Sequence, residues 1–293
     1  MAGNKGDRIA REMKRFLRRH LAVGRWWRSI SLSYRRENIE NSKFFNNKII
    51  KCNLCGHAGN AVYKNQDAEW ISSLGIDLLR ENITCQKCKG SARYRALGLI
   101  VSRACQDFDK ISPQASTILD TDPFSKLQPL FINNNNYKRS GYSPGIKSGG
   151  ELAPGITCVD LQQIPFPDDS LNLLISSDVI EHIDNDTLSF QEAFRVLRPG
   201  GKYIFTVPFA AERMVTQIRA FTTQDGTVVH RHPVQVHGDL QGGILARRIY
   251  GRDLVQQLEA CGFKVWHHLV VHEESGIFGV DVFEAEKVKP TDC

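Results

Sequence analysis

The sequence predicts an α/β protein with a doubly wound sheet, preceded by a small cysteine-rich domain and a basic N-terminal helix. Two observations lead to the sheet and the small domain. From residue 116 onward, short apolar segments alternate with helical segments, which is the pattern of a sheet covered by helices on both faces. Before this region stand two C-x2-C pairs, Cys52 with Cys55 and Cys85 with Cys88.

The N-terminal helix follows from an uneven distribution of charge. The chain of 293 residues has a net charge of +6, but residues 1–40 hold 11 Lys and Arg against four acids. This segment therefore carries +7 and the rest of the chain −1. The composition of the whole chain, with 41% hydrophobic residues, is that of an ordinary globular protein. No apolar run approaches the roughly 20 residues that a membrane-spanning helix needs.

Residues 1–48 form this basic arm. Its apolar residues share one face of a predicted helix, with Lys and Arg on the flanks and the opposite face: Ile9, Met13, Phe16, Leu17 and Leu21. Such a helix can pack its apolar stripe on the body of the protein. Alternatively, residues 8–28, with Trp26 and Trp27, contact an anionic membrane surface. Binding to nucleic acid and a targeting peptide are further interpretations.

The four paired cysteines have the spacing of a structural zinc site. One tight turn of the C-x2-C type presents two thiolates to the same ion, and structural Zn²⁺ takes four such ligands. We therefore predict a zinc ribbon over residues 49–96 that contributes folding energy and not catalysis, with Gly56 and Gly90 in turns that need a positive φ. Disulfide pairing is the alternative, and we interpret His57 as a bystander. The predicted ligands are Cys52, Cys55, Cys85 and Cys88.

The alternating elements after the ribbon can be assigned along the chain. A connector helix over 97–115 leads into the α/β domain, 116–293. The predicted strands cover 117–120, 137–140, 156–160, 171–177, 202–207, 264–271 and 278–285. The predicted helices cover 124–131, a segment that begins at an Asp186 cap and stops before Pro199, and 252–261. A polar insertion over about 208–243 interrupts this order.

Polar residues stand at the ends of four of these strands. The residues at the ends of the first four predicted strands are Asp120, Gly141 or Tyr142, Asp160, and Ser177 with Asp178. Because ligands of open α/β sheets bind beyond the carboxyl ends of the strands, we expect these residues to line one site.

Three consecutive motifs carry a resemblance to a known family. They are Asp160–Leu174 (DLQQIPFPDDSLNLL), Ser177–Ile183 (SDVIEHI) and Arg195–Gly201 (RVLRPGG). In order and spacing they resemble the class I S-adenosylmethionine-dependent methyltransferases, with a type 11-like domain, over about residues 116–286. The chain looks most similar to bacterial methyltransferases that carry an N-terminal zinc ribbon. Segments 234–239, 248–253 and 261–263 add to this resemblance.

The resemblance implies a Rossmann-like sheet of seven strands that binds S-adenosylmethionine. It places the adenine amino group on Asp160, the adenine ring on Leu161 and the methionine part beside Ser177 and Val179. Asp120 corresponds to the acid that ends the first strand. The implied cofactor-binding residues are Asp120, Thr121, Tyr142, Asp160, Leu161, Ser177 and Val179.

The chain departs from the family at two points. The first loop, Asp120–Phe124, contains no glycine, although the family's loop is usually glycine-rich so that the backbone can approach the cofactor. Gly141, or Tyr142 if the register slips by one, replaces the acid that usually holds the ribose. These departures leave a non-catalytic scaffold open as an alternative.

The resemblance implies methyl transfer, and we expect a small-molecule or glycan acceptor methylated on oxygen. A hydroxyl acceptor needs a general base, for which His182 after the fourth strand and His237 in the insertion are the candidates. Loops of this kind usually select the substrate, so we expect the acceptor at the insertion. An RNA-modifying enzyme or RNA-binding module is the alternative, disfavoured by the near-neutral body. The absence of a secretory signal pattern favours a cytoplasmic, or membrane-peripheral, location.

Overall fold

We describe the protein from a computed structural model, in which residues 48–63, 79–109, 116–237 and 243–288 are described. The chain divides into two compact units, Met1–Phe44 and Phe45–Cys293. All described residues belong to the second unit. The amphipathic helix predicted in the basic arm, with its membrane contact over 8–28, lies outside the described residues.

A sheet of eight strands forms the centre of the unit, in the order β16-β17-β9-β8-β4-β5-β7-β6. Neighbouring strands from β9 to β7 run parallel, whereas β17 runs antiparallel to both β9 and β16. The seven predicted strands are all present, and β6 adds an antiparallel edge that the sequence did not predict. The strands are β4 (Ile118–Asp120), β5 (Tyr137–Gly141), β6 (Glu151–Ala153), β7 (Ile156–Cys158), β8 (Leu171–Ser177), β9 (Leu197–Thr206), β16 (Phe263–His272) and β17 (Ile277–Lys287).

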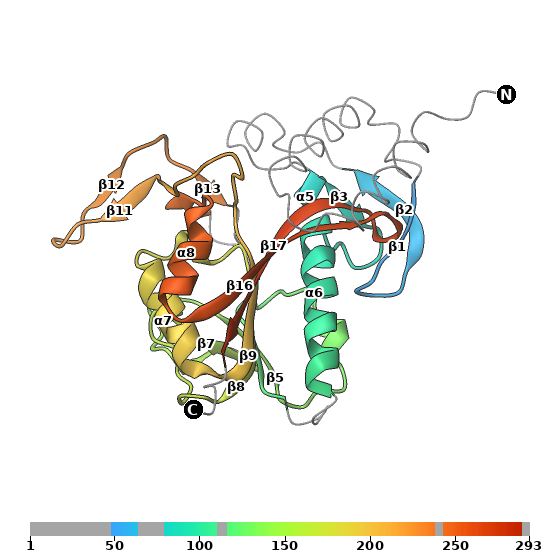
Figure 1. Cartoon of the computed structure of the whole chain (residues 1–293), viewed down its shortest axis with the longest axis horizontal. Coiled ribbons are helices and arrows are strands. Elements are labelled where there is room, and N and C mark those ends of the chain that lie inside the picture. Colours follow the sequence, from blue (N-terminus) through green and yellow to red (C-terminus); the bar gives the residue numbers. More distant parts are fainter. Residues whose placement is uncertain (1–47, 64–78, 110–115, 238–242, 289–293) are drawn as a thin grey trace. The chain divides into compact units, whose positions relative to one another are not determined.

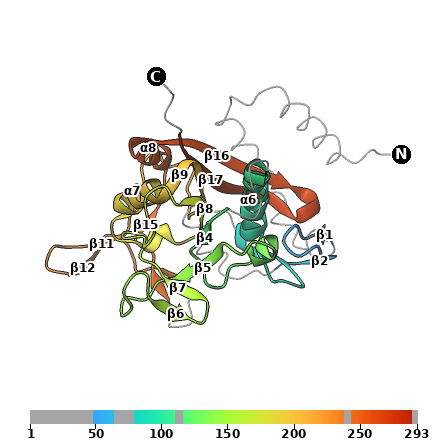
Figure 2. The same cartoon turned by 90° about the horizontal axis from the view of Figure 1, so that it is seen from below.

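Helices cover both faces of this sheet, which confirms the doubly wound arrangement. Helix α6 (Ala92–Asp109) lies on one face, and α7 (Asp186–Val196) and α8 (Asp253–Ala260) lie on the other (Figures 1 and 2). The core between the sheet and α7 and α8 is apolar and aromatic, with the rings of Tyr203 and Phe205 stacked at 4.5 Å. Strand β8 is buried along most of its length, as its continuous apolar sequence predicts.

Three predicted boundaries are wrong for local reasons. The helix predicted over 124–131 shrinks to the short 3-10 turn η1 (Gln128–Phe131), because the side chains of Asp122 and Ser125 accept backbone N–H groups of this loop and Pro129 has none to offer. Helix α7 is capped by Asn185 and not by Asp186: its side chain accepts the Leu188 N–H at 3.0 Å. Helix α6 begins at Ala92, five residues before the predicted connector.

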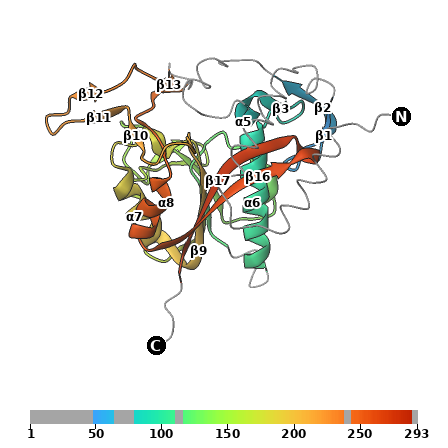
Figure 3. The ribbon, with the colours of Figure 1, turned by 45° about the horizontal axis from the view of Figure 1, so that its top comes forward.

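The cysteine-rich segment forms a small antiparallel sheet in the order β1-β2-β3. Its elements are β1 (Ile49–Lys51), β2 (Ala58–Tyr63), the short helix α5 (Leu79–Asn82) and β3 (Ile83–Cys85). This ribbon lies beside one end of α6 and the turn η3 (Glu273–Ser275) that joins β16 to β17 (Figure 3). It is therefore packed on the α/β domain and belongs to the same compact unit.

The polar insertion after β9 folds into three short antiparallel pairs. These are β10 (Gln217–Ile218) with β15 (Arg248–Ile249), β11 (Ala220–Thr222) with β12 (Val228–His230), and β13 (Val236–His237) with β14 (Ile244–Leu245). The β11–β12 hairpin projects from the body (Figure 1). In the part of the chain that is described, no helix is long and apolar enough to cross a membrane.

Candidate functional site

The strand ends with polar residues meet at one edge of the central sheet. Strands β4, β5, β7 and β8 run parallel, so that their carboxyl ends lie on the same side. Backbone bonds continue the sheet into the loops: Thr121 N–H donates to Ile175 O at 3.0 Å, and Val159 N–H donates to Gly141 O at 2.8 Å. The structure thus brings together the segments that carry the predicted cofactor residues.

Asp160 follows β7 with its carboxylate held in a fixed direction. Its Oδ1 accepts the backbone N–H of Gln162 at 2.8 Å, and its own N–H donates to Ser148 Oγ at 3.1 Å. Among the described residues, no hydrogen bond is made to Oδ2. Leu161 is buried in the core beside it. Asp160 is half-buried, so this orientation leaves one carboxylate oxygen for a ligand.

The end of β5 is closely packed around Gly141. A Cβ on Gly141 would come within 2.8 Å of Leu152 Cδ2 and 3.1 Å of Pro123 Cγ, so the Leu152 side chain would have to move to admit one. The next side chain, Tyr142, is 61% exposed. Desolvation and the nearby Asp160 carboxylate raise the pKa of its phenol. Tyr142 is therefore the polar side chain that the end of β5 presents to solvent.

The first loop, Asp120–Phe124 after β4, begins with an acid that is buried and not presented to solvent. Asp120 is only 1% exposed and accepts the Tyr137 hydroxyl at 2.9 Å and the Asp122 N–H at 3.2 Å. Burial raises the pKa of Asp120 to about 7. Thr121 is 7% exposed, and its hydroxyl makes no hydrogen bond with the described residues. A buried hydroxyl without a hydrogen bond is energetically costly, so Thr121 is an unusual feature of this loop.

Two arginines from the ribbon side reach the end of β8. Arg80 on α5 makes two hydrogen bonds to the Asp178 carboxylate, both at 2.7 Å, and Arg93 at the start of α6 donates to Ser177 Oγ and to Glu81. Thr206 also donates to Asp178, at 2.9 Å. We call this set the arginine bridge: Arg80, Glu81, Arg93, Ser177 and Asp178.

The arginine bridge holds the backbone after β8 in an unusual conformation. Asp178 has a φ of +54°, which non-glycine residues rarely adopt, and its bidentate contact with Arg80 secures it. Arg93 binds a nearby carboxylate, that of Glu81, and Arg95 binds nearby backbone carbonyls. Arg80 was missed because its partner lies 98 residues away in the chain. Ser177, expected beside the methionine part, has its hydroxyl engaged by Arg93, and Val179 is half-buried beside it.

The two candidate bases lie at the insertion side of this edge. His182 is in the turn η2 (Ile180–His182), where its Nδ1 lies 2.9 Å from Leu245 O and its Nε2 lies 3.7 Å from the carboxylate of Glu181. Glu181 is fully buried, and this burial raises its pKa well above the usual value. The His182 ring thus joins η2 to β14. His237 lies in β13, and its side chain is outside the described part of the structure.

The four paired cysteines converge on one point. Their Sγ atoms all lie within 4.8 Å of one another, with Cys52 to Cys88 at 3.7 Å and Cys55 to Cys85 at 3.8 Å. A tetrahedron with Zn–S bonds of about 2.3 Å has edges of about 3.8 Å, so the four sulfurs fit a zinc ion. The distances are too long for S–S bonds, and all four thiols are free. Disulfide pairing is therefore wrong for this structure.

Each C-x2-C pair is followed by a turn, and a different residue adopts the positive φ in each of the two turns. In the first, Gly56 has the predicted positive φ, +69°. In the second, Lys89 has it, at +59°, and Gly90 does not. Gly90 is needed for close approach instead, since a Cβ there would lie 3.1 Å from Leu54 Cδ1. The prediction that Gly90 has a positive φ is therefore wrong.

Arg95 joins the metal-binding knuckle to the sheet. Its side chain is fully buried and donates to four carbonyl oxygens, those of Ile83, Gly90, Ser275 and Gly276, at 2.6 to 3.2 Å. Burial lowers the pKa of Arg95, and the neighbouring thiols oppose this effect. A buried cation beside four sulfur ligands offsets the negative charge that the thiolates carry when they bind Zn²⁺.

Comparison with known proteins identifies the α/β domain. Residues 136–205 match the model of a methyltransferase domain family. The order of the sheet, with one antiparallel strand inserted next to the last of the parallel strands, is the fold that the sequence motifs predicted. The matched segment, which runs from the start of β5 into β9, is therefore similar to a methyltransferase domain.

Two curated proteins resemble parts of this chain. A protein of Mycolicibacterium smegmatis named a probable S-adenosylmethionine-dependent methyltransferase is 27% identical over 122 residues, which is 42% of this chain and 40% of the relative. A dimethylglycine N-methyltransferase of Parasynechococcus marenigrum is 31% identical over 90 residues, 31% of each chain. The chain thus spans less than half the length of the curated relatives it matches.

Solved methyltransferases also resemble the structure. One from Mesorhizobium loti aligns with a TM-score of 0.39 at 16% identity, over 68% of this chain and 99% of that one. The glycopeptide N-methyltransferase MtfA, solved with S-adenosylmethionine, aligns with a TM-score of 0.39 at 19% identity, over 64% of this chain and 93% of that one. S-adenosylmethionine is the methyl donor that the match of residues 136–205 implies, and Asp160, within this segment, has one carboxylate oxygen that accepts no hydrogen bond from the described residues.

Proposed function

We propose that the protein transfers a methyl group from S-adenosylmethionine to a hydroxyl of a small-molecule or glycan acceptor. The observation that carries the proposal is Asp160: an oriented, half-buried carboxylate at the end of β7, inside the segment that matches the methyltransferase domain. When bound, the sulfonium cofactor supplies an electrophilic methyl group. The residues of this chain would hold the cofactor, exclude water and position the acceptor.

The proposed cofactor site runs along the carboxyl ends of the parallel strands. Asp160 accepts the adenine amino group, Leu161 packs on the ring, and Tyr142 lies on the ribose side. Thr121 offers its unpartnered hydroxyl from the first loop, and Ser177 and Val179 line the methionine end. Asp120 is better suited to supporting the loop than to contacting the cofactor, because Tyr137 and Asp122 already bind its two oxygens.

The zinc ribbon supports this site from outside it. We propose that Cys52, Cys55, Cys85 and Cys88 hold a structural Zn²⁺ ion, since their sulfur spacing suits tetrahedral coordination with no open position. The ion would fix the two C-x2-C pairs relative to each other, and the arginine bridge connects this part of the chain to the end of β8.

The proposed acceptor site lies at the insertion, which packs on η2 beside the cofactor edge: the Arg247 N–H donates to Glu181 O at 2.9 Å. His182 and His237 remain the candidate bases. The contacts of His182 with Leu245 and Glu181 favour a role in positioning the insertion. This leaves His237 as the stronger candidate for removing a hydroxyl proton.

Calorimetric titration with S-adenosylmethionine tests the proposal. We expect saturable binding by the full chain, and at least about tenfold weaker binding by Asp160→Ala, since hydrogen bonds to charged groups contribute about 1.5–3 kcal/mol. Asp168→Ala is the matched control: Asp168 is on the same loop but exposed, and pairs with Arg195 at 2.7 Å. No binding at millimolar cofactor would favour a non-catalytic scaffold. Unchanged binding by Asp160→Ala would overturn the site.

A further inference from the structure

The insertion and the segment that follows it, up to the start of α8, together hold more arginines than acids. Residues 208–252 contain six arginines and three acids. Arg247 pairs with Asp184 at 2.8 Å and Arg248 pairs with Asp186 at 2.9 Å. Within the described residues, the other four arginines have no ion pair: Arg213, Arg219, Arg231 and Arg252.

Arg219 is the most deeply placed of these four. Its side chain is 8% exposed and makes one described hydrogen bond, from Nη2 to Pro233 O at 2.8 Å. Its Nε is buried and has no hydrogen-bond partner. Arg252, by contrast, donates its Nε to Ala211 O at 2.6 Å, and Arg231 is exposed and stacks on the Phe221 ring.

Arg213 lies near enough to Arg219 for its positive charge to act on the Arg219 pKa, and it has the same lack of hydrogen-bond partners among the described residues. Its Nε is also buried without a partner, and among the described residues its guanidinium makes no hydrogen bond. Both arginines are anchored to one segment: the Arg219 N–H donates to Arg247 O at 2.7 Å, and Arg213 O accepts the Arg252 N–H at 3.0 Å. Burial, together with the positive charge of Arg213, lowers the pKa of Arg219.

Two neighbouring guanidinium groups, one of them buried, are unfavourable unless an anion is bound between them. An unpaired buried charge costs several kcal/mol, and each planar guanidinium can give a carboxylate or phosphate two parallel hydrogen bonds. The acids of the insertion do not meet this need in the described structure: Glu212 is exposed without an ion pair, and Asp225 accepts hydrogen bonds from Thr223 and Thr227 at the hairpin tip.

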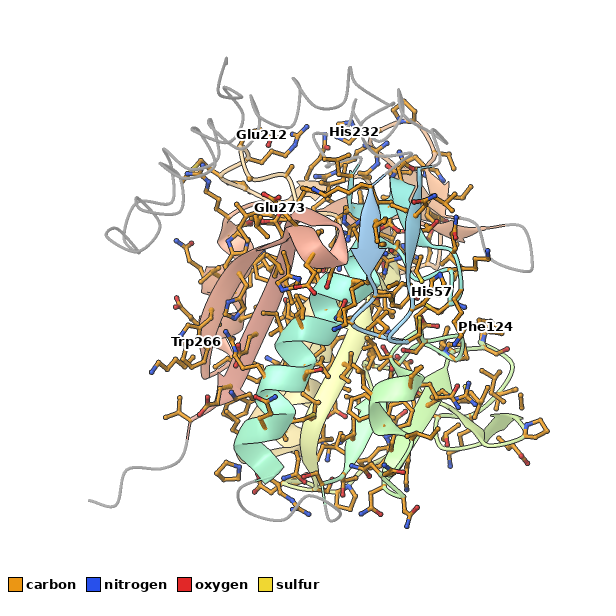
Figure 4. All side chains as sticks on the ribbon, turned by 90° about the vertical axis from the view of Figure 1, so that its right-hand side faces the viewer. His57, Phe124, Glu212, His232, Trp266 and Glu273 are labelled. Atoms are coloured by element: carbon orange, nitrogen blue, oxygen red, sulfur yellow. The ribbon has the colours of Figure 1, made fainter. Side chains whose placement is uncertain are left out.

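The pair lies on the acceptor side of the methyltransferase site. Arg219 is bonded to Arg247, whose own N–H donates to Glu181 O in η2, directly after β8. Figure 4 shows Glu212, next to Arg213, and His232 at the same end of the molecule. His232 accepts or donates a hydrogen bond with Gln217 at 3.1 Å, two residues before Arg219.

We propose that Arg213 and Arg219 form an anion-binding subsite for a carboxylate or phosphate group of the acceptor. The assignment of the anion to the acceptor rests on the proposed function, whereas the binding of the anion itself does not. The bound oxyanion would satisfy the two unpartnered Nε–H groups and hold the acceptor by its charged end.

Titration of the full chain with inorganic phosphate, at constant ionic strength and without cofactor, tests the subsite. We expect saturable binding in calorimetry, weakened at least tenfold in Arg213→Gln and Arg219→Gln. Arg231→Gln is the matched control, because it removes the same charge from an exposed position of the same insertion, and its affinity should change less than twofold. Acetate in place of phosphate distinguishes the two oxyanions: the tighter ligand identifies the group on the acceptor.

Stability provides a second readout that a purely structural arginine would not give. Without phosphate, Arg219→Gln should unfold at a higher temperature than the wild type, because an unpaired buried charge is removed; with saturating phosphate, this order should reverse. If Arg219→Gln is less stable in both conditions, or if Arg231→Gln loses as much affinity, the subsite is wrong. Asp239, the third acid of the insertion, lies outside the described residues. If phosphate bound only to the Asp239→Asn variant, the proposal would also be overturned.

Binding of S-adenosylmethionine is measured in a separate titration. Failure of phosphate to bind would therefore leave the proposed function standing.

Discussion

Asp120 shows how one residue can keep a family position and change its role. It ends β4, as the family's acid does, yet it is buried and bonded to Tyr137 and Asp122. A loop without glycine closes over it, with Pro123 packed near the end of β5. The sequence predicted the position of this acid, but its burial depends on Tyr137 and Pro123, which only the folded chain brings to it.

The burial of Asp120 has a consequence for stability that depends on pH. Its pKa is raised from 3.8 to about 7, so between these values the folded protein binds more protons than the unfolded chain. Stability should therefore fall as pH rises from about 4 to about 7, by at most about 4 kcal/mol, and stay level above. Asp120→Asn, which keeps the shape without the charge, should remove this loss.

Urea unfolding of wild type and Asp120→Asn at pH 5 and pH 8 measures this effect. The variant should gain stability relative to wild type at pH 8 more than at pH 5. Metal binding by the cysteines also varies with pH, but it is common to both proteins and cancels in the difference. Asp168→Asn, an exposed acid, serves as control. An equal difference at both pH values would show that Asp120 is ionised throughout.

The zinc ribbon is the element whose ligands could be predicted most fully. A C-x2-C pair contains both the ligands and the turn that presents them, so the local sequence suffices. What it could not predict is the attachment of the ribbon to the rest of the chain. Arg95 joins Ile83 and Gly90 in the ribbon to Ser275 and Gly276 at the far end of the sequence.

Because of this attachment, removal of the metal should affect the whole compact unit. We expect about one zinc ion per chain in metal analysis. Treatment with a strong chelator should lower the unfolding temperature by roughly 10 °C or more, in a single transition. Differential scanning calorimetry with and without chelator measures this, with Cys105→Ser as a control thiol outside the cluster. A separate early transition of the ribbon alone would show that the two parts unfold independently.

At the scale of the whole molecule, the arginine bridge links the metal cluster to the cofactor edge. Arg80 precedes the ligand Cys85 by five residues, and Arg93 follows Cys88 by five. Both reach the end of β8, where Arg80 holds Asp178 at its positive φ. A shift of the two cysteine pairs on loss of zinc would therefore reach the loop after β8, which we propose lines the cofactor site.

We expect chelation to weaken binding of S-adenosylmethionine at least about threefold, or roughly 0.7 kcal/mol. Arg80→Gln should weaken it similarly, and in that variant chelation should add little, because the connection is already broken. Arg103→Gln is the control: it removes an ion pair between α6 and Glu284, away from the loop. Calorimetric titration of the three proteins with and without chelator measures this. Additive effects of chelation and Arg80→Gln would contradict the link.

Part of this protein is determined by its sequence alone. The buried parallel strands, the helices and the metal knuckles have local signals, namely apolar runs, helical periodicity and paired ligands, because each depends on neighbours in the chain. The motifs around Asp160 likewise predicted where the adenine end of the proposed site lies. The exceptions were places where a side chain competes with the helix for backbone N–H groups. Before η1, the side chains of Asp122 and Ser125 accept such groups and prevent the predicted helix.

The tertiary structure decided what depends on distant residues. Arg80 meets Asp178, Arg95 meets Ser275, and Arg213 approaches Arg219 with no acid from the described residues between them. A charged side chain in the sequence has no visible partner until folding buries it, and its partner can come from any part of the chain. For this reason the sequence predicted a methyltransferase with a zinc ribbon, whereas the proposed coupling of the two parts and the proposed anion subsite rest on contacts that only the folded protein shows.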